Sequence, residues 1–167
     1  NIRKLYDGNA GSPQRSCSEK PEFIHDENTP RLQLTPKHYA YLKIADGCDN
    51  RCSYCSIPGI RGGLRSRPSD SVLAEAEALV RGGCRELIII AQDTTAFGKD
   101  LHKSHENLPA LLRKLDGLQG RFWIRLLYTH PAHFTDELIS VFKGSKHILP
   151  YVDMPLQHIS DRILMGM

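Results

Sequence analysis

The pattern of hydrophobic and polar positions changes character near residue 38. Residues 1–37 hold several prolines among polar side chains and follow neither a helical nor a strand period. Proline-rich polar stretches without periodicity are typical of linkers and irregular arms. We therefore expect an irregular arm over residues 1–37 and one folded domain over residues 38–167.

From residue 39 onward, apolar runs of strand length alternate with amphipathic stretches of helical period. Residues 87–91 are apolar at every position, which is typical of a parallel strand buried on both faces. Asn107 and Thr135 are residue types that cap helix N-termini. The sequence predicts strands over residues 39–45, 87–91, 122–128 and 148–154, and helices over residues 69–81, from Asn107 to Gly117 and from Thr135 to Gly144.

This alternation predicts an α/β fold with a parallel sheet, either an open sheet or a barrel. Enzymes built on barrels assemble their active sites at the carboxyl ends of the strands, although open sheets bind ligands there as well. Polar residues follow all four predicted strands, at positions 46, 92–95, 129–130 and 157–158. These four coincidences favour one common active face, which either a barrel or an open sheet can provide.

Composition and charge narrow the class of protein. Hydrophobic residues make up 40% of the 167 residues and charged residues 25%, close to the average of globular proteins, which excludes disorder or a fibrous repeat as the main state. The net charge of +3 is too small to identify a nucleic-acid partner. No apolar stretch approaches the roughly 20 residues of a membrane-spanning helix. We expect a cytoplasmic protein with no membrane partner.

The chain starts at Asn1 without an initiator Met and ends at Met167 just as a helix begins. We therefore expect it to be part of a longer protein.

Three of the five cysteines, Cys48, Cys52 and Cys55, fall within eight positions directly after the first predicted strand. An odd total and this clustering favour metal ligation over disulfides. A [4Fe-4S] cluster normally takes four thiolates, so three cysteines leave one iron open to another ligand. We interpret the three cysteines as ligands of a [4Fe-4S] cluster.

A structural zinc site is the alternative, with Cys84 or a histidine as the fourth ligand. Zinc sites usually pair two Cys-x2-Cys knuckles, and the chain has no second pair. Cys84 lies next to a buried strand, where a thiol packs as a small apolar side chain, so we expect it to be structural. Cys17 falls in the predicted arm, where we expect a free thiol.

The spacing Cys48-x3-Cys52-x2-Cys55, with Tyr54 just before the last cysteine, resembles the motif of the radical S-adenosylmethionine (SAM) superfamily. In that family the open iron binds SAM, which is cleaved reductively to give a radical that abstracts hydrogen from carbon. The resemblance implies that Tyr54 packs near the adenine of SAM. It also implies an α/β fold, a partial (β/α)6 TIM-like barrel of which this chain holds about four βα units and which is incomplete at its C-terminus.

Further segments resemble the methylthiotransferase branch of that family, and within it the RimO type, which modifies a ribosomal protein. The resemblance implies a transferase that replaces a β-hydrogen of an aspartate in a small-subunit ribosomal protein with S-CH3, and that draws electrons from a donor such as a flavodoxin or ferredoxin. The related type that modifies adenosine in tRNA usually carries Gln-Asn where this chain has Gln92-Asp93. The segments are Tyr41-Leu42-Lys43-Ile44, Ser56-Ile57-Pro58, Arg61-Gly62, Ser66-Arg67-Pro68, Gln92-Asp93-Thr94-Thr95, His130-Pro131, Phe134-Thr135-Asp136-Glu137-Leu138 and Pro155-Leu156-Gln157-His158-Ile159-Ser160-Asp161.

The resemblance also implies parts that this chain does not contain. The family holds a second [4Fe-4S] cluster with three cysteines of an N-terminal domain, and it recognises its substrate with a C-terminal TRAM domain. We therefore expect this chain to be inactive by itself. A tRNA adenosine methylthiotransferase and a non-catalytic zinc-binding module remain as alternative functions.

We expect further cofactor-binding residues at strand ends and inside the barrel. Gln92 and Asp93 follow the second strand, although Asp93 is as well suited to a helix cap or a loop hydrogen bond. Arg125 lies inside an apolar strand, from which we expect it to point into the barrel toward an anionic carboxylate. We assign Gln157 and His158 to the polar active face or the surface, Arg61, Arg65 and Arg67 to a solvated loop, and Trp123 and Met154 to the core.

Overall fold

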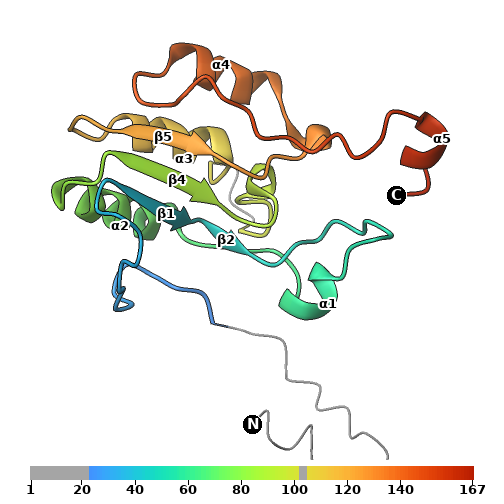
Figure 1. Ribbon diagram of the computed structural model, residues 1–167, viewed down its shortest axis with the longest axis horizontal. Coiled ribbons are helices and arrows are strands. Elements are labelled where there is room, and N and C mark those ends of the chain that lie inside the picture. Colours follow the sequence, from blue (N-terminus) through green and yellow to red (C-terminus); the bar gives the residue numbers. More distant parts are fainter. Residues whose placement is uncertain (1–22, 102–104) are drawn as a thin grey trace, which may run out of the picture.

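The computed structural model describes residues 23–101 and 105–167 (Figure 1). Three parallel strands, β1 (Tyr39–Lys43), β4 (Glu86–Ile90) and β5 (Trp123–Leu126), form a sheet in the order β1-β4-β5. A helix connects each strand to the next, as the predicted α/β fold requires. The other elements are β2 (Ala45–Asp46), α1 (Ile57–Arg61), β3 (Arg65–Ser66), α2 (Ser69–Arg81), η2 (Thr94–Ala96), α3 (Leu108–Asp116), η3 (Pro131–His133), α4 (Asp136–Gly144) and α5 (Asp161–Leu164).

The core lies on one face of this sheet, where α2, α3 and α4 pack (Figure 1). Leu42, Leu87, Ile89 and Ile124 point to this face and are fully buried. Burial of each such side chain stabilises the fold by about 2 kcal/mol. The prediction that residues 87–91 are buried on both faces was wrong, because Ile88 and Ile90 are only half-buried on the face that no described helix covers.

The three long helices begin and end where the sequence predicts. In α3 the Asn107 side chain accepts a hydrogen bond from the backbone N–H of Ala110 (2.8 Å), and in α4 Thr135 accepts one from Leu138 (3.2 Å). Capping of this kind satisfies N–H groups that have no partner within the helix. Among the described helices, none has the length and apolarity needed to cross a membrane.

The fourth predicted strand, over residues 148–154, was wrong. This segment does run parallel to β5, but only Ile148 pairs with Ile124, as an isolated bridge. Pro150 lacks an N–H and cannot continue the ladder. The segment pairs again with the stretch that follows β5, where the backbone N–H of Thr129 donates to Asp153 O (3.0 Å).

The described part of the arm, residues 23–37, forms no helix or strand. Residues 1–22, including Cys17, lie outside the described residues, so the division into arm and domain stays a prediction. Side chains of the arm and Arg67 occupy the outer edge of β1, whose carbonyl groups alternate between β4 and the outside. Tyr39 O accepts from Gln33 Nε2 (3.0 Å) and Thr35 Oγ1 (2.9 Å), Tyr41 O from Arg31 Nη2 (2.8 Å), and Lys43 O from Arg67 Nη1 (2.9 Å).

Two predicted environments were wrong. Arg67 does not lie in a solvated loop: its side chain is 2% exposed and pairs with Glu75 at 2.5 Å, because the planar guanidinium can satisfy several buried acceptors at once. Trp123 is not a core residue. It opens β5 on the face without helices and is 51% exposed.

Candidate functional site

A pocket of about 190 Å³ lies at the carboxyl ends of the parallel strands, under the loop that carries the three cysteines. It brings together six of the seven residues for which the sequence predicts a ligand or cofactor role. The pocket walls come from three places in the chain: the cysteine loop, the segment after β4 and the segments after β5. The six predicted residues are Cys48, Cys52, Tyr54, Cys55, Gln92 and Asp93.

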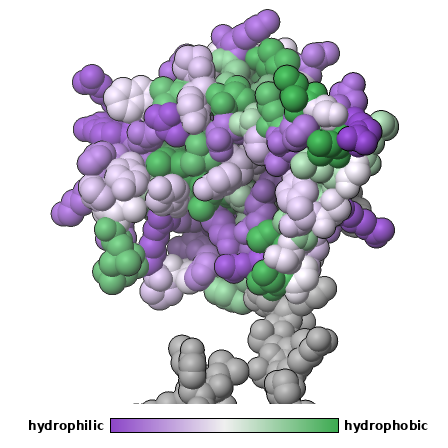
Figure 2. All heavy atoms as spheres, turned by 45° about the vertical axis from the view of Figure 1, so that its right-hand side comes forward, coloured by the Kyte–Doolittle hydropathy of each residue, from purple (hydrophilic) through white to green (hydrophobic). Residues whose placement is uncertain are grey.

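A larger hollow of about 970 Å³ adjoins this pocket and shares Asn50, Tyr54 and Gln157 with it. Leu156 and Ile159 give it an apolar wall. Figure 2 turns this end of the molecule toward the reader and shows apolar groups exposed there among hydrophilic ones. Ligand pockets usually enclose about 300–1,000 Å³, so the two spaces together are large enough for a ligand of SAM's class.

The first half of the cysteine loop is fixed to the segment that follows α1. Gly47 has a φ of +75°, and a Cβ at this position would collide with the carbonyl oxygen of Gly63. Cys48 donates its backbone N–H to Gly62 O (3.2 Å). Asp49 Oδ1 accepts from the backbone N–H of Leu64 (2.9 Å). Both flanks of Cys48 are therefore tied to one neighbouring segment.

The second half of the loop is tied to the C-terminal residues, where the backbone N–H of Ser53 donates to Met167 O (2.6 Å). Cys55 donates its backbone N–H to Cys52 O (3.0 Å), which closes a single turn around Tyr54. Ser53 Oγ donates to Gly166 O (2.9 Å). Cys48 and Cys52 are half-buried, whereas Cys55 is exposed. Burial raises the pKa of the Cys48 thiol, so a metal that binds there must displace its proton.

Asp93 connects this loop to the ends of the strands. Its Oδ2 accepts a hydrogen bond from Asn50 Nδ2 (2.8 Å) and lies 2.9 Å from His133 Nδ1, while Oδ1 accepts from Thr95 Oγ1. Burial by itself would raise the pKa of the Asp93 carboxyl, but the hydrogen bonds from Thr95, Asn50 and His133 hold the pKa below its usual range. The carboxylate is therefore ionised and can act only as a hydrogen-bond acceptor.

Gln92 presents an unused acceptor in the pocket. Its Oε1 is buried and has no hydrogen-bond partner among the described residues. A buried polar atom without a partner costs free energy that a bound donor can recover. Together with three thiols in the walls of the same pocket, this atom fits a cluster with a ligand that carries N–H or O–H groups.

The fit does not extend to a preassembled metal site. Within residues 23–101 and 105–167, no three His, Cys, Asp or Glu side chains are arranged so that they could hold one metal ion.

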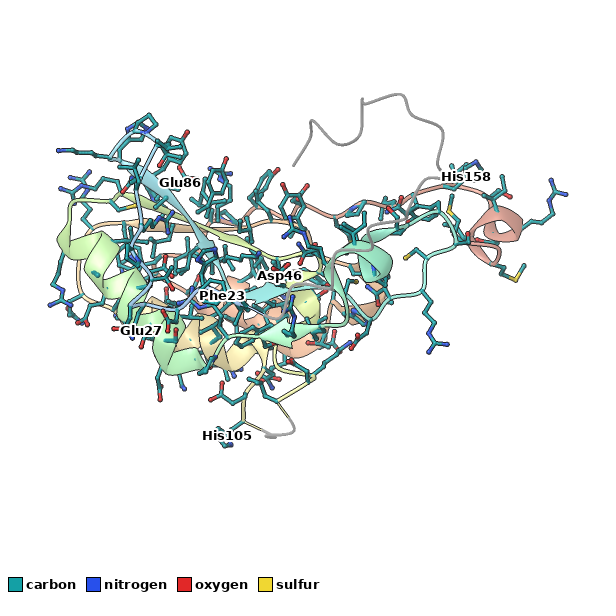
Figure 3. The ribbon with its side chains drawn as sticks, turned by 90° about the horizontal axis from the view of Figure 1, so that it is seen from below. Phe23, Glu27, Asp46, Glu86, His105 and His158 are labelled. Atoms are coloured by element: carbon teal, nitrogen blue, oxygen red, sulfur yellow. The ribbon has the colours of Figure 1, made fainter. Side chains whose placement is uncertain are left out.

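Arg125, the seventh predicted residue, is not among the residues that line the pocket. It does lie on the helix-free face of the sheet, but it pairs there with Glu86 (2.5 Å) and covers the Tyr151 ring at 5.0 Å. Figure 3 shows Glu86 at the opposite end of the molecule from His158, which lines the larger hollow. The expected role of Arg125 at a cofactor therefore stays a prediction.

Several residues of the site carried no recognised signal in the sequence. Asn50 and His133 both contact the Asp93 carboxylate. Tyr128 lines the pocket, and its backbone has a φ of +59°. Gln157, which was expected at the active face or the surface, also lines the pocket and has a φ of +63°. Positive φ values at residues other than glycine are costly and concentrate at functional sites, but nothing in a Tyr or Gln side chain predicts them.

Comparison with known proteins identifies the family and similar proteins. The family model described as "Radical SAM superfamily" matches residues 42–167. The chain is 45% identical over 166 residues to "Ribosomal protein uS12 methylthiotransferase RimO" of Desulfitobacterium hafniense (strain Y51), covering 99% of this chain and 37% of that protein. It is 51% identical over 166 residues to the protein of the same name in Syntrophus aciditrophicus (strain SB), covering 99% and 36%.

Solved structures share the fold at lower identity. A radical S-adenosylmethionine methyltransferase, TsrM, from Kitasatospora setae with cobalamin and a [4Fe-4S] cluster bound superposes with a TM-score of 0.60 at 21% identity, over 77% of this chain and 24% of that one. The chain thus spans little more than a third of the length of the curated relatives it matches.

Proposed function

Because this chain belongs to the radical SAM superfamily, we propose that the protein it comes from is a methylthiotransferase that modifies an aspartate of ribosomal protein uS12. The observation that carries this proposal is the convergence of Cys48, Cys52, Cys55 and Gln92 on one pocket at the strand ends. Relatives at 45% and 51% identity that bear this activity in their names support the choice of substrate.

The three cysteines of the loop would hold a [4Fe-4S] cluster with one open iron. When bound, the cluster and SAM supply the one-electron chemistry that removes hydrogen from an unactivated carbon. Tyr54, which lines both spaces, would lie beside the adenine. Gln92 Oε1 would accept a hydrogen bond from SAM, and so orient it at the base of the pocket. Asp93 would support the site indirectly, through the hydrogen bonds that its carboxylate accepts within the protein.

The larger hollow would admit the substrate. Its apolar wall of Leu156, Ile159 and Leu164 would exclude water from the side chain being modified. A second [4Fe-4S] cluster, the domain that recognises the ribosomal protein and the contact with a flavodoxin or ferredoxin would come from other parts of the protein. We propose that this protein works in the cytoplasm, where its ribosomal substrate is made.

Modification of adenosine in tRNA is the second candidate. No contact in the pocket favours it, and Gln92-Asp93 departs from the Gln-Asn typical of that type. A non-catalytic zinc module would leave the unpaired acceptor of Gln92 without a use.

The test is anaerobic iron and sulfide analysis of the complete, reconstituted protein, with a visible spectrum and mass spectrometry of uS12 after reaction. We expect the triple variant Cys48→Ala, Cys52→Ala, Cys55→Ala to lose the iron of one cluster, about four atoms per chain, and to stop adding S-CH3. The matched control is Cys84→Ala, a buried cysteine that does not line the pocket, which should keep both. Zinc in place of iron, or methylthiolated tRNA with unmodified uS12, would contradict the proposal.

A further inference from the structure

One carboxylate, that of Asp93, links three segments that lie far apart in the sequence. It holds Asn50 of the cysteine loop, Thr95 of η2 and His133 of η3. We propose that Asp93 is a positioning residue: through Asn50 it ties the cysteine loop to the ends of the strands before a cluster binds. This inference rests on the proposed function only in taking the cysteines of that loop as ligands.

The environment of Asp93 makes it a support and not a ligand-binding group. Its side chain is 3% exposed. An ionised carboxylate offers about four acceptor positions, and Asn50, Thr95 and His133 occupy three of them. Only one acceptor position is therefore left for a ligand, on a side chain that is almost fully buried.

Asn50 is well placed to transmit this support. It lies two residues after Cys48 and two before Cys52, and its side-chain amide reaches across 43 positions of sequence to Asp93. This one side chain thus joins the segment after β4 to the cysteine loop.

Asp93 is itself held on both sides. Thr95 Oγ1, which donates to Asp93, accepts the backbone N–H of His130 (3.1 Å). His133, in the next turn of chain, reaches the same carboxylate. The segments after β4 and β5 are therefore joined at Asp93, and the loop is tied to their junction. A tie to one mobile segment would not fix the loop, whereas a tie to this junction does.

Reversal of the donor and acceptor tests the contact itself. Asn50→Asp places two carboxylates against each other and should open the loop. Asp93→Asn in that background restores a donor opposite the new acceptor, with His133 Nδ1 in the tautomer that accepts from the new amide, and keeps the net charge of the natural protein. Asn50→Ala removes the contact without adding charge, and Asp93→Asn should not rescue it. Asn107→Asp is the matched control, because Asp caps a helix as well as Asn does.

The readout is amide hydrogen exchange of residues 48–55 in the complete protein after anaerobic removal of its clusters, followed by iron uptake on reconstitution. We expect exchange in the loop to be about tenfold faster in Asn50→Asp and Asn50→Ala, and most of the increase to be reversed in the exchanged double variant. Iron uptake should slow and recover in the same order. Asn107→Asp should match the natural protein.

Loop exchange that is unchanged in Asn50→Asp, or equally fast in the single and exchanged double variants, would overturn the positioning role. This result is distinct from failure of the proposed function. If the loop responds as expected but the protein takes up no iron and sulfide, the positioning role stands and the cluster assignment fails. If iron binds normally but hydrogen exchange in the loop is unaffected by the changes at Asn50 and Asp93, the cluster assignment stands and the positioning role fails.

Discussion

Gly47 and Gly63 lie so close together that a side chain on Gly47 has no room. Gly47 also adopts a φ of +75°, where a Cβ adds strain of its own. Gly47→Ala should therefore displace Cys48, at a local cost of at least about 2 kcal/mol. We expect the variant to lose most of the iron that the triple cysteine variant loses. Gly59→Ala, in α1 with no atom near its Cβ, is the control and should keep its iron.

Gln92→Leu should affect stability and binding in opposite directions. It removes a buried acceptor that has no partner, so the free energy of unfolding of the cluster-free protein should stay equal or rise by about 1 kcal/mol. SAM affinity of the reconstituted protein should fall about tenfold through loss of one hydrogen bond. Urea denaturation and equilibrium binding measure the two effects. Gln119→Leu, which is exposed, should change neither, and unchanged SAM affinity in Gln92→Leu would disprove the role of this acceptor.

Arg125→Met tests the residue that the structure places away from the pocket. If its partner is Glu86, SAM affinity should stay within about twofold, and the free energy of unfolding should fall by less than about 1 kcal/mol, because the pair is partly exposed. Glu86→Gln should have the same small effect, and the two changes together should add little. A large loss of SAM affinity in Arg125→Met alone would support the predicted role of Arg125 in binding the cofactor.

Arg67→Met should be the most destabilising of these changes. The guanidinium is buried against Glu75 and Ser71, and its loss removes the donor to the Ser71 hydroxyl and one of the two arginines that pair with Glu75. Breaking a buried ion pair costs about 3 kcal/mol or more, somewhat less here because Arg31 still pairs with Glu75 (2.6 Å). Arg81→Met, which breaks an exposed pair with Glu77, should cost less than about 0.5 kcal/mol. Urea denaturation of the complete protein separates the two, and equal effects would contradict the burial argument.

Local signals account for what the sequence predicted of the fold. A cap such as Asn107 or Thr135 and a run of apolar residues at helical spacing lie within a dozen positions, so α3 and α4 could be placed accurately. The fourth strand failed because an apolar run says nothing of whether a ladder forms beside it, and Pro150 interrupts that ladder. Trp123 failed because the exposed face of a sheet is decided by what packs elsewhere in the fold.

The candidate site divides in the same way. The cysteine spacing and the polar strand ends are local patterns, and they located the pocket. Two of the partners of Asp93, Asn50 and His133, are 43 and 40 positions away, and hydrogen bonds over such separations leave no periodic trace in one sequence. A charged residue in an apolar strand gives no local means to choose among partners, so the sequence could not indicate that Arg125 pairs with Glu86.

The side chains along the outer edge of β1 determine at which edge the sheet can be extended. Since the carbonyls of Tyr39, Tyr41 and Lys43 are already taken, a further strand cannot be added at that edge. The sheet can be extended only beyond β5, where Ile148 already occupies the next place. A barrel built from this sheet would therefore stay open at the outer edge of β1. A neighbouring copy of the protein would also be prevented from adding a strand at this edge.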